Sequence, residues 1–128
     1  MESSAIKELQ QVLAKNGNGE YADQMAQYMK NNFPFYGIQS TPRRRISRQW
    51  LKNYPIANES DTCAILKLLW AKDQREFQYI GSDIAKKNKQ KLTPKSIPIL
   101  EYCIRAKSWW DTVDALAAHP IGMIVQQY

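Results

Sequence analysis

Apolar residues recur every three or four positions along most of this 128-residue chain, which is the spacing of one face of an amphipathic helix. Alternation with a period of two, the pattern of a half-buried strand, is almost absent. The pattern therefore predicts an all-α protein of about seven or eight short helices. Two of the clearest apolar stripes are Ile6, Leu9 and Leu13, and Phe77, Ile80 and Ile84.

Turn and proline signals divide these stripes into helices. Asn16-Gly17-Asn18-Gly19 separates the first helix from the second. Thr41-Pro42 is expected to begin a third helix, with Thr41 as its N-cap and Pro42 in its first helical position. Tyr54-Pro55 is expected to end it, because the residue before a proline is disfavoured in the α region. A fourth helix is expected over about residues 59–71.

Capping residues predict where the later helices begin. Asp73 and Glu76 resemble an acidic capping pair for a fifth helix. Ser108 and Asp111 fit a capping box, which would give Asp111 a structural role. His119-Pro120 is expected to kink the last helix or to start another, with His119 as a turn residue.

Short helices joined by short turns favour a stacked array of helical hairpins, with residues 1–128 as a single domain. A compact helical bundle stays open on spacing alone. Ile121, Ile124 and Val125 form an apolar patch near the last residue, and no polar outer helix follows it. Helical arrays need a polar terminal repeat. We therefore expect the chain to be the N-terminal part of a longer array, or the patch to mediate self-association.

Composition places the chain among ordinary globular proteins, with 44% hydrophobic and 23% charged residues. Charges interrupt every apolar run before it reaches the ~20 residues that a membrane span needs. No secretory signal pattern begins the chain, so a cytoplasmic location is expected. Cys63 and Cys103 suggest neither a disulfide framework nor a zinc site, and both thiols are expected to be buried and reduced. We expect no metal, cofactor or membrane partner.

Basic charge is concentrated in the middle of the chain. Residues 43–95 hold thirteen basic and five acidic side chains, a surplus of +8, whereas each flank carries −1. Such a surplus can follow a phosphate backbone, although a solvated helix surface has the same composition. Arginines in the first turns of one helix oppose the helix dipole and favour an external anion. The predicted nucleic-acid contacts there are Arg43, Arg44, Arg45 and Arg48.

A short segment near the end of the chain carries the most distinctive chemistry. Trp109, Val113 and Leu116 share one apolar stripe that suits the core. Trp110 and Asp114 are one helical turn apart, on a face turned about 100° away. On spacing alone, an incidental pair of surface or interface residues is the favoured interpretation. A tryptophan beside a carboxylate also suits a site where a cationic or electron-poor group meets a π face and an anion.

Five segments, taken in order, resemble the AlkD-type alkylpurine DNA glycosylases of the HEAT-like-repeat DNA alkylation repair family. The last of them is Ser-Trp-Trp-Asp-Thr-Val-Asp at residues 108–114, which looks like the family signature. The resemblance runs along the whole chain but covers little more than half of a typical member. The four earlier segments are Met25-Ala26-Gln27-Tyr28-Met29-Lys30-Asn31, Phe35-Tyr36-Gly37-Ile38-Gln39, Pro42 with Arg44-Arg45, and Leu69-Trp70 with Arg75-Glu76-Phe77-Gln78.

The resemblance implies a curved HEAT-like array of helical hairpins whose concave, basic face holds duplex DNA. It also implies hydrolysis of the N-glycosidic bond of cationic N3- or N7-alkylated purines. By motif, Trp110 would line the cleft against the sugar, and Asp114 would stabilise the oxocarbenium ion and help to position a water. Tyr28 and Gln39 would lie near the DNA. Tyr28 also continues an apolar stripe, so core packing is the favoured interpretation for it.

The resemblance leaves the enzymatic status of this chain uncertain. The family places a catalytic arginine in later repeats, so we expect this chain alone to be poorly active or inactive. One alternative is a non-catalytic helical-repeat DNA-binding module, which rests on the basic surplus alone. Another is a protein-interaction solenoid, which requires that surplus to be incidental.

Overall fold

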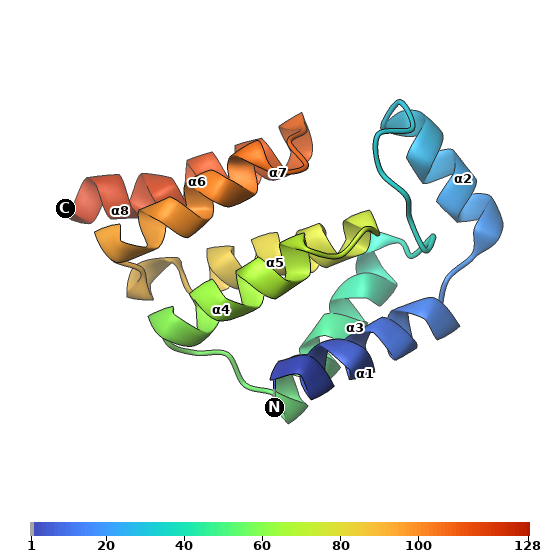
Figure 1. The fold of residues 1–128 in the computed structure, drawn as a ribbon, viewed down its shortest axis with the longest axis horizontal. Helices are drawn as coiled ribbons and strands as arrows, with labels where there is room; N and C mark the ends of the chain where they lie inside the picture. The colour runs from blue at the N-terminus through green and yellow to red at the C-terminus, as the bar shows by residue number, and fades with distance from the viewer. Residues whose placement is uncertain (1) are drawn as a thin grey trace. The chain divides into compact units, whose positions relative to one another are not determined.

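The helices follow the apolar stripes of the sequence closely. In a computed structural model that describes residues 2–128, the chain forms helices and no strand. The prediction of an all-α, helical-repeat fold is confirmed. The α-helices are α1 (Glu2–Lys15), α2 (Gly19–Tyr28), α3 (Ser40–Asn53), α4 (Glu59–Trp70), α5 (Arg75–Lys87), α6 (Ile97–Arg105), α7 (Trp110–Leu116) and α8 (Gly122–Gln127) (Figure 1). The shorter turns are η1 (Lys89–Lys91), η2 (Pro94–Ser96) and the π-helical η3 (Ala117–Ile121).

The helices divide into two compact units. The first unit comprises Met1–Pro55 and Lys72–Ile80, and the second comprises Ile56–Ala71 and Gly81–Tyr128. Helix α5 therefore contributes its first half to one unit and its second half to the other. The expectation of one domain over residues 1–128 stays a prediction.

The core of the first unit lies where α1 packs against α3 (Figure 1). The predicted stripe of α1 is buried, with Leu9 and Leu13 both fully inaccessible. From α3, Trp50 is 3% exposed, and its indole Nε1 donates a hydrogen bond of 2.8 Å to the backbone carbonyl of Ala5. A buried indole N–H usually has such a partner, and this bond holds the tryptophan against α1.

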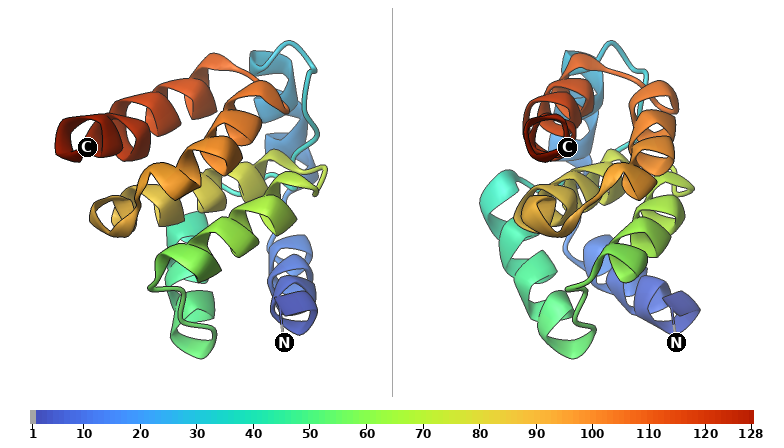
Figure 2. Two further views of the ribbon diagram at one scale, coloured as in Figure 1. Left: turned by 60° about the vertical axis from the view of Figure 1, so that its left-hand side comes forward. Right: turned by 90° about the vertical axis from the view of Figure 1, so that its left-hand side faces the viewer.

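The core of the second unit lies where α6 packs beside α4 and α7 (Figure 2). Leu66, Leu100 and Leu116, one from each of these helices, are at most 1% exposed. Cys103 is also buried, as predicted, but Cys63 is only half-buried. The prediction for Cys63 is wrong because its helical position lies at the edge of this core rather than inside it.

The half-buried carboxylate of Glu59 links the start of α4 to the turn before α6. Glu59 accepts hydrogen bonds from the backbone N–H and the hydroxyl of Thr93 and from the hydroxyl of Ser96. The Ser96 hydroxyl and the Thr93 N–H lower the pKa of Glu59 below its ordinary value, because they stabilise the charged form. Thr93 also caps η2, as its position before a proline suggests.

Two predicted helix starts need correction. Helix α3 begins at Ser40, and its N-cap is Gln39, whose side chain makes no capping hydrogen bond. Thr41 is therefore not the N-cap, and Pro42 lies in the first turn, where a missing N–H costs nothing. Helix α7 has Trp109 as its N-cap with an extended backbone, so the capping box predicted for Ser108 and Asp111 does not form. Asp111 instead accepts from the backbone N–H of Thr112.

The last helix continues through its proline. Helices α7 and α8 are joined by the π-helical turn η3, which contains Pro120. A π turn accommodates the missing N–H and the bulk of the ring that an α-helical turn would not. The kink expected at His119-Pro120 is thus absorbed within the helix, and His119 lies in this π turn rather than in a loop.

The terminal apolar patch is largely covered by the chain itself. Ile124 is 3% exposed and belongs to the core of the second unit, and Ile121 packs against the same core. Val125 is 70% exposed. Ile124 therefore does not belong to an exposed patch, because α8 turns that side chain inward. Within residues 2–128, no helix has the length and apolar character needed to cross a membrane.

We predict that Gly81→Ala destabilises the second unit. A Cβ on Gly81 would lie 2.7 Å from Cζ3 of Trp70, a ring that is 1% exposed and cannot move aside freely. Overpacking of this kind costs about 1–3 kcal/mol, which exceeds the ~1 kcal/mol that alanine gains in helix propensity. Urea unfolding followed by circular dichroism should show a lower free energy of unfolding.

The matched control is Gly19→Ala, in the first turn of α2, where an added Cβ would meet nothing within 4 Å. This variant should unfold at the same urea concentration as the wild type or at a slightly higher one. Equal stability of the two variants would show that the contact between α4 and α5 tolerates a methyl group.

Candidate functional site

Trp110 and Asp114 lie together on the outer face of α7. Trp110 is 55% exposed and Asp114 is exposed, whereas Thr112 and Leu116 on the opposite side are buried. The spacing of four residues places the two outer side chains one turn apart. The predicted pairing of an exposed aromatic ring and a carboxylate is therefore confirmed as geometry. The predicted core stripe is also present in part, since Trp109 is half-buried.

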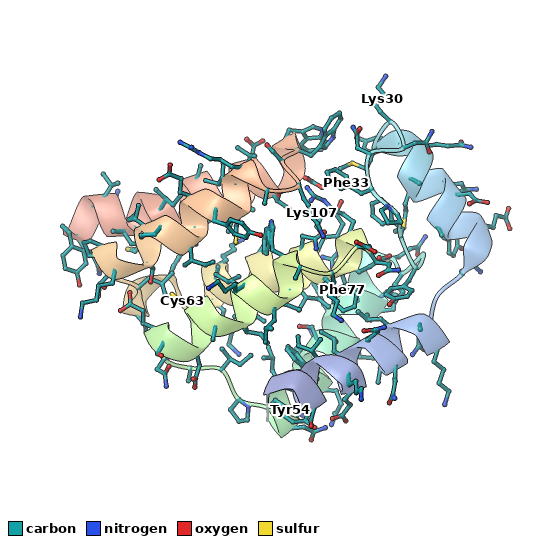
Figure 3. All side chains as sticks on the ribbon, in the orientation of Figure 1. Lys30, Phe33, Tyr54, Cys63, Phe77 and Lys107 are labelled. Carbon is teal, nitrogen blue, oxygen red and sulfur yellow. The ribbon has the colours of Figure 1, made fainter. Side chains whose placement is uncertain are left out.

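The turn before α7 depends on a residue that the sequence did not single out. Lys107 adopts a left-handed conformation, with φ of 54°, at the turn between α6 and α7 (Figure 3). This conformation is unfavourable for a residue with a side chain and is usually adopted by glycine or asparagine. It reverses the chain sharply after Arg105 and so sets where Trp110 begins its helix.

The basic residues of α3 fall into two groups. Arg44, Arg45 and Arg48 are exposed, and no carboxylate among the described residues pairs with them. Arg43 is only 9% exposed, and its guanidinium lies 4.8 Å from the ring centre of Tyr79. Its inclusion among the predicted nucleic-acid contacts is therefore corrected. It is not a solvated residue either, because the helical turn directs it inward against α5.

The exposed arginines give the start of α3 a strongly positive potential. The first turn of this helix contains no acidic residue, so the partial positive charge of the helix N-terminus adds to that of the arginines. Charges of one sign that share a helix face raise the local concentration of anions. This face of α3 is thus suited to a polyanion.

A buried carboxylate holds the loop that leads into α3. Glu76 is fully buried, and its two carboxylate oxygens accept hydrogen bonds from the backbone N–H groups of Tyr36, Gly37 and Ile38, at 3.0, 3.0 and 3.2 Å. The predicted role of Glu76 as a helix cap is wrong, because its side chain reaches a loop about 40 residues away in the sequence. Three consecutive N–H groups on one carboxylate fix the backbone of this loop.

Glycine is required in the middle of this loop. Gly37 has φ of +91°, and a Cβ there would lie 1.9 Å from the backbone oxygen of Asn18. The positive φ turns successive N–H groups toward one point, which is the geometry of an anion-binding nest. In this protein the carboxylate of Glu76 occupies that nest.

Arg75, the neighbour of Glu76, holds the other end of the same loop. Its side chain is fully buried, with the guanidinium 3.9 Å from the ring centre of Phe33, and its backbone N–H donates to the carbonyl of Pro34 at 2.8 Å. Sequence reasoning missed the role of this Arg-Glu pair. The available signals were a charged pair directly before the apolar Phe77 and the place of both residues in one of the family-like segments.

Tyr28 and Gln39 flank this loop region and are both exposed. Tyr28, at the end of α2, is 73% exposed, whereas the adjacent Met29 is 3% exposed. The favoured interpretation of Tyr28 as a core residue is therefore wrong, because the helix ends there and Met29 takes the inward position. Gln39 is exposed at the N-cap of α3, beside the basic face.

The remaining candidates for reactive chemistry are the Cys103 thiol and possible metal ligands. Burial raises the pKa of the Cys103 thiol to about 12, so it stays protonated and is a poor nucleophile. Among the described residues, no three His, Cys, Asp or Glu side chains are placed to hold a metal ion.

The fold and these surfaces define an all-α helical-repeat protein with an outward tryptophan–aspartate pair and a basic helix. The model of the DNA alkylation repair enzyme family matches residues 9–128, and the chain belongs to this family. Among solved structures, the chain is similar to a predicted DNA alkylation repair enzyme from Enterococcus faecalis, with 32% identity and a TM-score of 0.75. The match covers 87% of this chain and 52% of that one, so the chain spans about half of that protein's length. No curated protein matches the chain.

We predict that Glu76→Gln destabilises the first unit by about 2 kcal/mol or more. Glutamine has one acceptor oxygen, so its amide group would face a backbone N–H and leave a buried donor without a partner, and the charge-assisted bonds are lost. Urea unfolding followed by tryptophan fluorescence would measure the loss.

The matched control is Glu101→Gln, which removes a charge from an exposed pair whose carboxylate lies 2.7 Å from the guanidinium of Arg105. Exposed pairs on one helix are worth ~0.5 kcal/mol or less. A loss of equal size in both variants would contradict the anchoring role of Glu76.

Proposed function

We propose that the protein carrying this chain is a DNA glycosylase that hydrolyses the N-glycosidic bond of cationic N3- or N7-alkylated purines in duplex DNA. The observation that carries the proposal is the exposed pair of Trp110 and Asp114 in a member of the DNA alkylation repair enzyme family. The residues present suit the chemistry of that reaction.

The reaction separates a leaving group that already carries a positive charge. When the bond between C1′ and the purine nitrogen breaks, its electron pair neutralises the purine, and positive charge develops on the sugar as an oxocarbenium ion. A carboxylate close to the sugar stabilises that charge. In this proposal Asp114 is that carboxylate, and it also orients the water that adds to C1′ and then loses a proton.

Trp110 would supply the surface against which the sugar rests. Its ring lies one turn before Asp114 on the same face, so a sugar in contact with the ring would also be near the carboxylate. The negative π face of an indole attracts a developing cation as well. The resemblance implies a further arginine in later repeats, so we propose that Trp110 and Asp114 form one wall of the site.

The exposed face of α3 would bind the DNA backbone. Arg44, Arg45 and Arg48 would contact phosphates, with Tyr28 and Gln39 as further contacts from the same unit. Arg43 is left out of this interface because it is buried. We also propose that the protein acts in the cytoplasm.

A second candidate is a non-catalytic helical-repeat module that binds DNA without excising bases. The unpaired arginines of α3 support DNA binding equally well under both proposals. The two proposals differ only in whether a base is excised. Substitution of Asp114 can therefore distinguish them, whereas substitutions in α3 cannot.

We expect the whole protein that carries this chain to bind duplex DNA with little sequence preference and a strong dependence on salt. If about four to six phosphates are neutralised, the slope of log K against log salt concentration should be roughly −4 to −5. Fluorescence anisotropy with duplexes of several sequences would measure it. Arg44→Glu with Arg45→Glu should weaken binding to all duplexes alike, and a slope near zero would remove the nucleic-acid proposal.

We expect Asp114→Asn, made in the whole protein that carries this chain, to lower excision of N7-methylguanine about a hundredfold or more. One well-placed electrostatic group is often worth ~3 kcal/mol in the transition state. Folding should be nearly unchanged, because the side chain is exposed. Single-turnover kinetics on a duplex with one lesion would measure the rate.

The control for this variant is Asp111→Asn, in the same helix. Asparagine keeps an oxygen that can accept from the N–H of Thr112, so the loss of stability should be about 1 kcal/mol or less and excision should be spared. Wild-type protein that binds the duplex and excises nothing would favour the non-catalytic module. Equal excision by wild type and Asp114→Asn would contradict the role of Asp114.

A further inference from the structure

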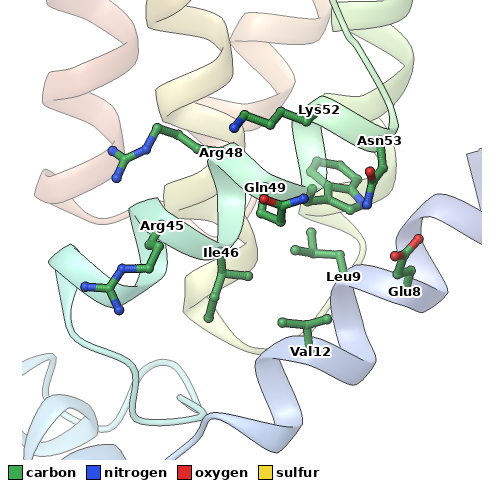
Figure 4. Close-up of a pocket in the computed structure, with 10 residues that line it drawn as sticks. Glu8, Leu9, Val12, Arg45, Ile46, Arg48, Gln49, Lys52 and Asn53 are labelled. Atoms are coloured by element: carbon green, nitrogen blue, oxygen red, sulfur yellow. The ribbon is translucent and has the colours of Figure 1, made fainter.

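The first unit contains an open groove that takes no part in the proposed chemistry. It lies between α1 and α3 and has a volume of about 460 Å³ (Figure 4). Pockets that bind ligands typically enclose about 300–1,000 Å³. Leu9 and Val12 line the groove from α1, and Ile46 and Trp50 line it from α3.

The groove has a fixed floor and an exposed apolar wall. Leu9 is fully buried and Trp50 is 3% exposed, so both belong to the core of the first unit and cannot rearrange without disrupting it. Above them, Val12 is 37% exposed and Ile46 is half-exposed. The apolar surface is therefore preformed. Its burial by a partner would be favourable and would require no rearrangement of this chain.

The charges along the groove are mostly positive. Arg45, Arg48 and Lys52 line it from α3, at intervals of three and four residues, and therefore follow one face of the helix for two turns. Their charged ends extend from α3 away from α1, so they flank the apolar interior on one side (Figure 4). This row is about 10 Å long at the rise of an α-helix. Glu8 lines the groove from α1. The groove thus combines an apolar interior with a net surplus of two positive charges.

We propose that this groove binds an acidic amphipathic helix of a partner protein. The apolar face of such a helix would pack on Val12 and Ile46. Acidic side chains one turn apart would reach the row of three cations, as in the helix-in-groove mode of peptide recognition. In a short helix, side chains one turn apart have the same spacing as the three cations. Such a helix also has a width suited to the groove between α1 and α3.

Other occupants fit these features less well. A DNA backbone offers phosphates to the cations but no apolar face for Val12 and Ile46. A small carboxylic acid offers one anion to a row of cations about 10 Å long. The proposal does not depend on the glycosylase activity, although Arg45 and Arg48 also belong to the proposed DNA interface.

The probe is a synthetic helix-forming peptide of about five turns, with leucines at helical spacing on one face and glutamates on both sides of them. Its control is a peptide of the same composition in which the order is scrambled, so that the apolar face is lost. Fluorescence anisotropy with the whole chain should show the amphipathic peptide binding at least about tenfold more tightly than the scrambled one.

Two matched variants locate the binding site. Val12→Asn places an amide in the apolar wall without changing charge, and it should weaken peptide binding about tenfold, because the amide would be buried without a partner. Val125→Asn makes the same change at another exposed valine, on α8, and should leave peptide binding within about twofold. Lys52→Glu should weaken the acidic peptide and favour a version with lysines in place of glutamates.

Three outcomes would overturn the proposal. The first is binding of the scrambled peptide as tightly as the amphipathic one, and the second is an equal effect of Val12→Asn and Val125→Asn on the peptide. The third is loss of duplex binding in Val12→Asn, which would assign the groove to the DNA interface. Loss of excision in Asp114→Asn is measured separately, so failure of the glycosylase proposal leaves this test intact.

Discussion

The carboxylate of Glu76 is the constraint on which the first unit depends. It is fully buried and satisfies three consecutive N–H groups of the loop before α3, two of them through one oxygen. Loop N–H groups that have no backbone partner are usually hydrogen-bonded to water. Here the side chain of Glu76, from α5, takes the place of that water. The path of residues 36–38, and with it the start of α3, is fixed by this one group and by the positive φ of Gly37.

This anchoring explains how charged residues are divided between structure and function. Arg75 and Arg43 are buried against the aromatic rings of Phe33 and Tyr79, where stacking and cation–π attraction offset the loss of hydration. Because these cations are used within the unit, the exposed positive charge of α3 is that of Arg44, Arg45, Arg48 and Lys52. The net positive charge that residues 43–95 present at the surface is therefore smaller than the surplus counted from their sequence.

The pair on α7 is positioned by different means. Trp110 and Asp114 need only a regular helix to lie one turn apart, and that helix is held by its buried side, through Thr112 and Leu116. The left-handed Lys107 sets where the helix begins. Asp114 is exposed and does not belong to the core. Its carboxylate is therefore available for chemistry, and its replacement would leave the packing unchanged.

The sequence by itself determined the helices and the outward face of α7, because periodicity is a local property and a spacing of four residues has one meaning on a helix. It did not determine the roles of Arg43, Glu76 or Tyr28, or the burial of Ile124. Arg43 and Arg44 are adjacent identical residues, and the buried one lies against the ring of Tyr79, which comes from another helix. Glu76 looked like a cap because a capping pair is local, whereas its three partners are about 40 residues away. Tertiary structure decided these roles, since the free energy of a buried charge depends on which donors and rings meet it across the chain.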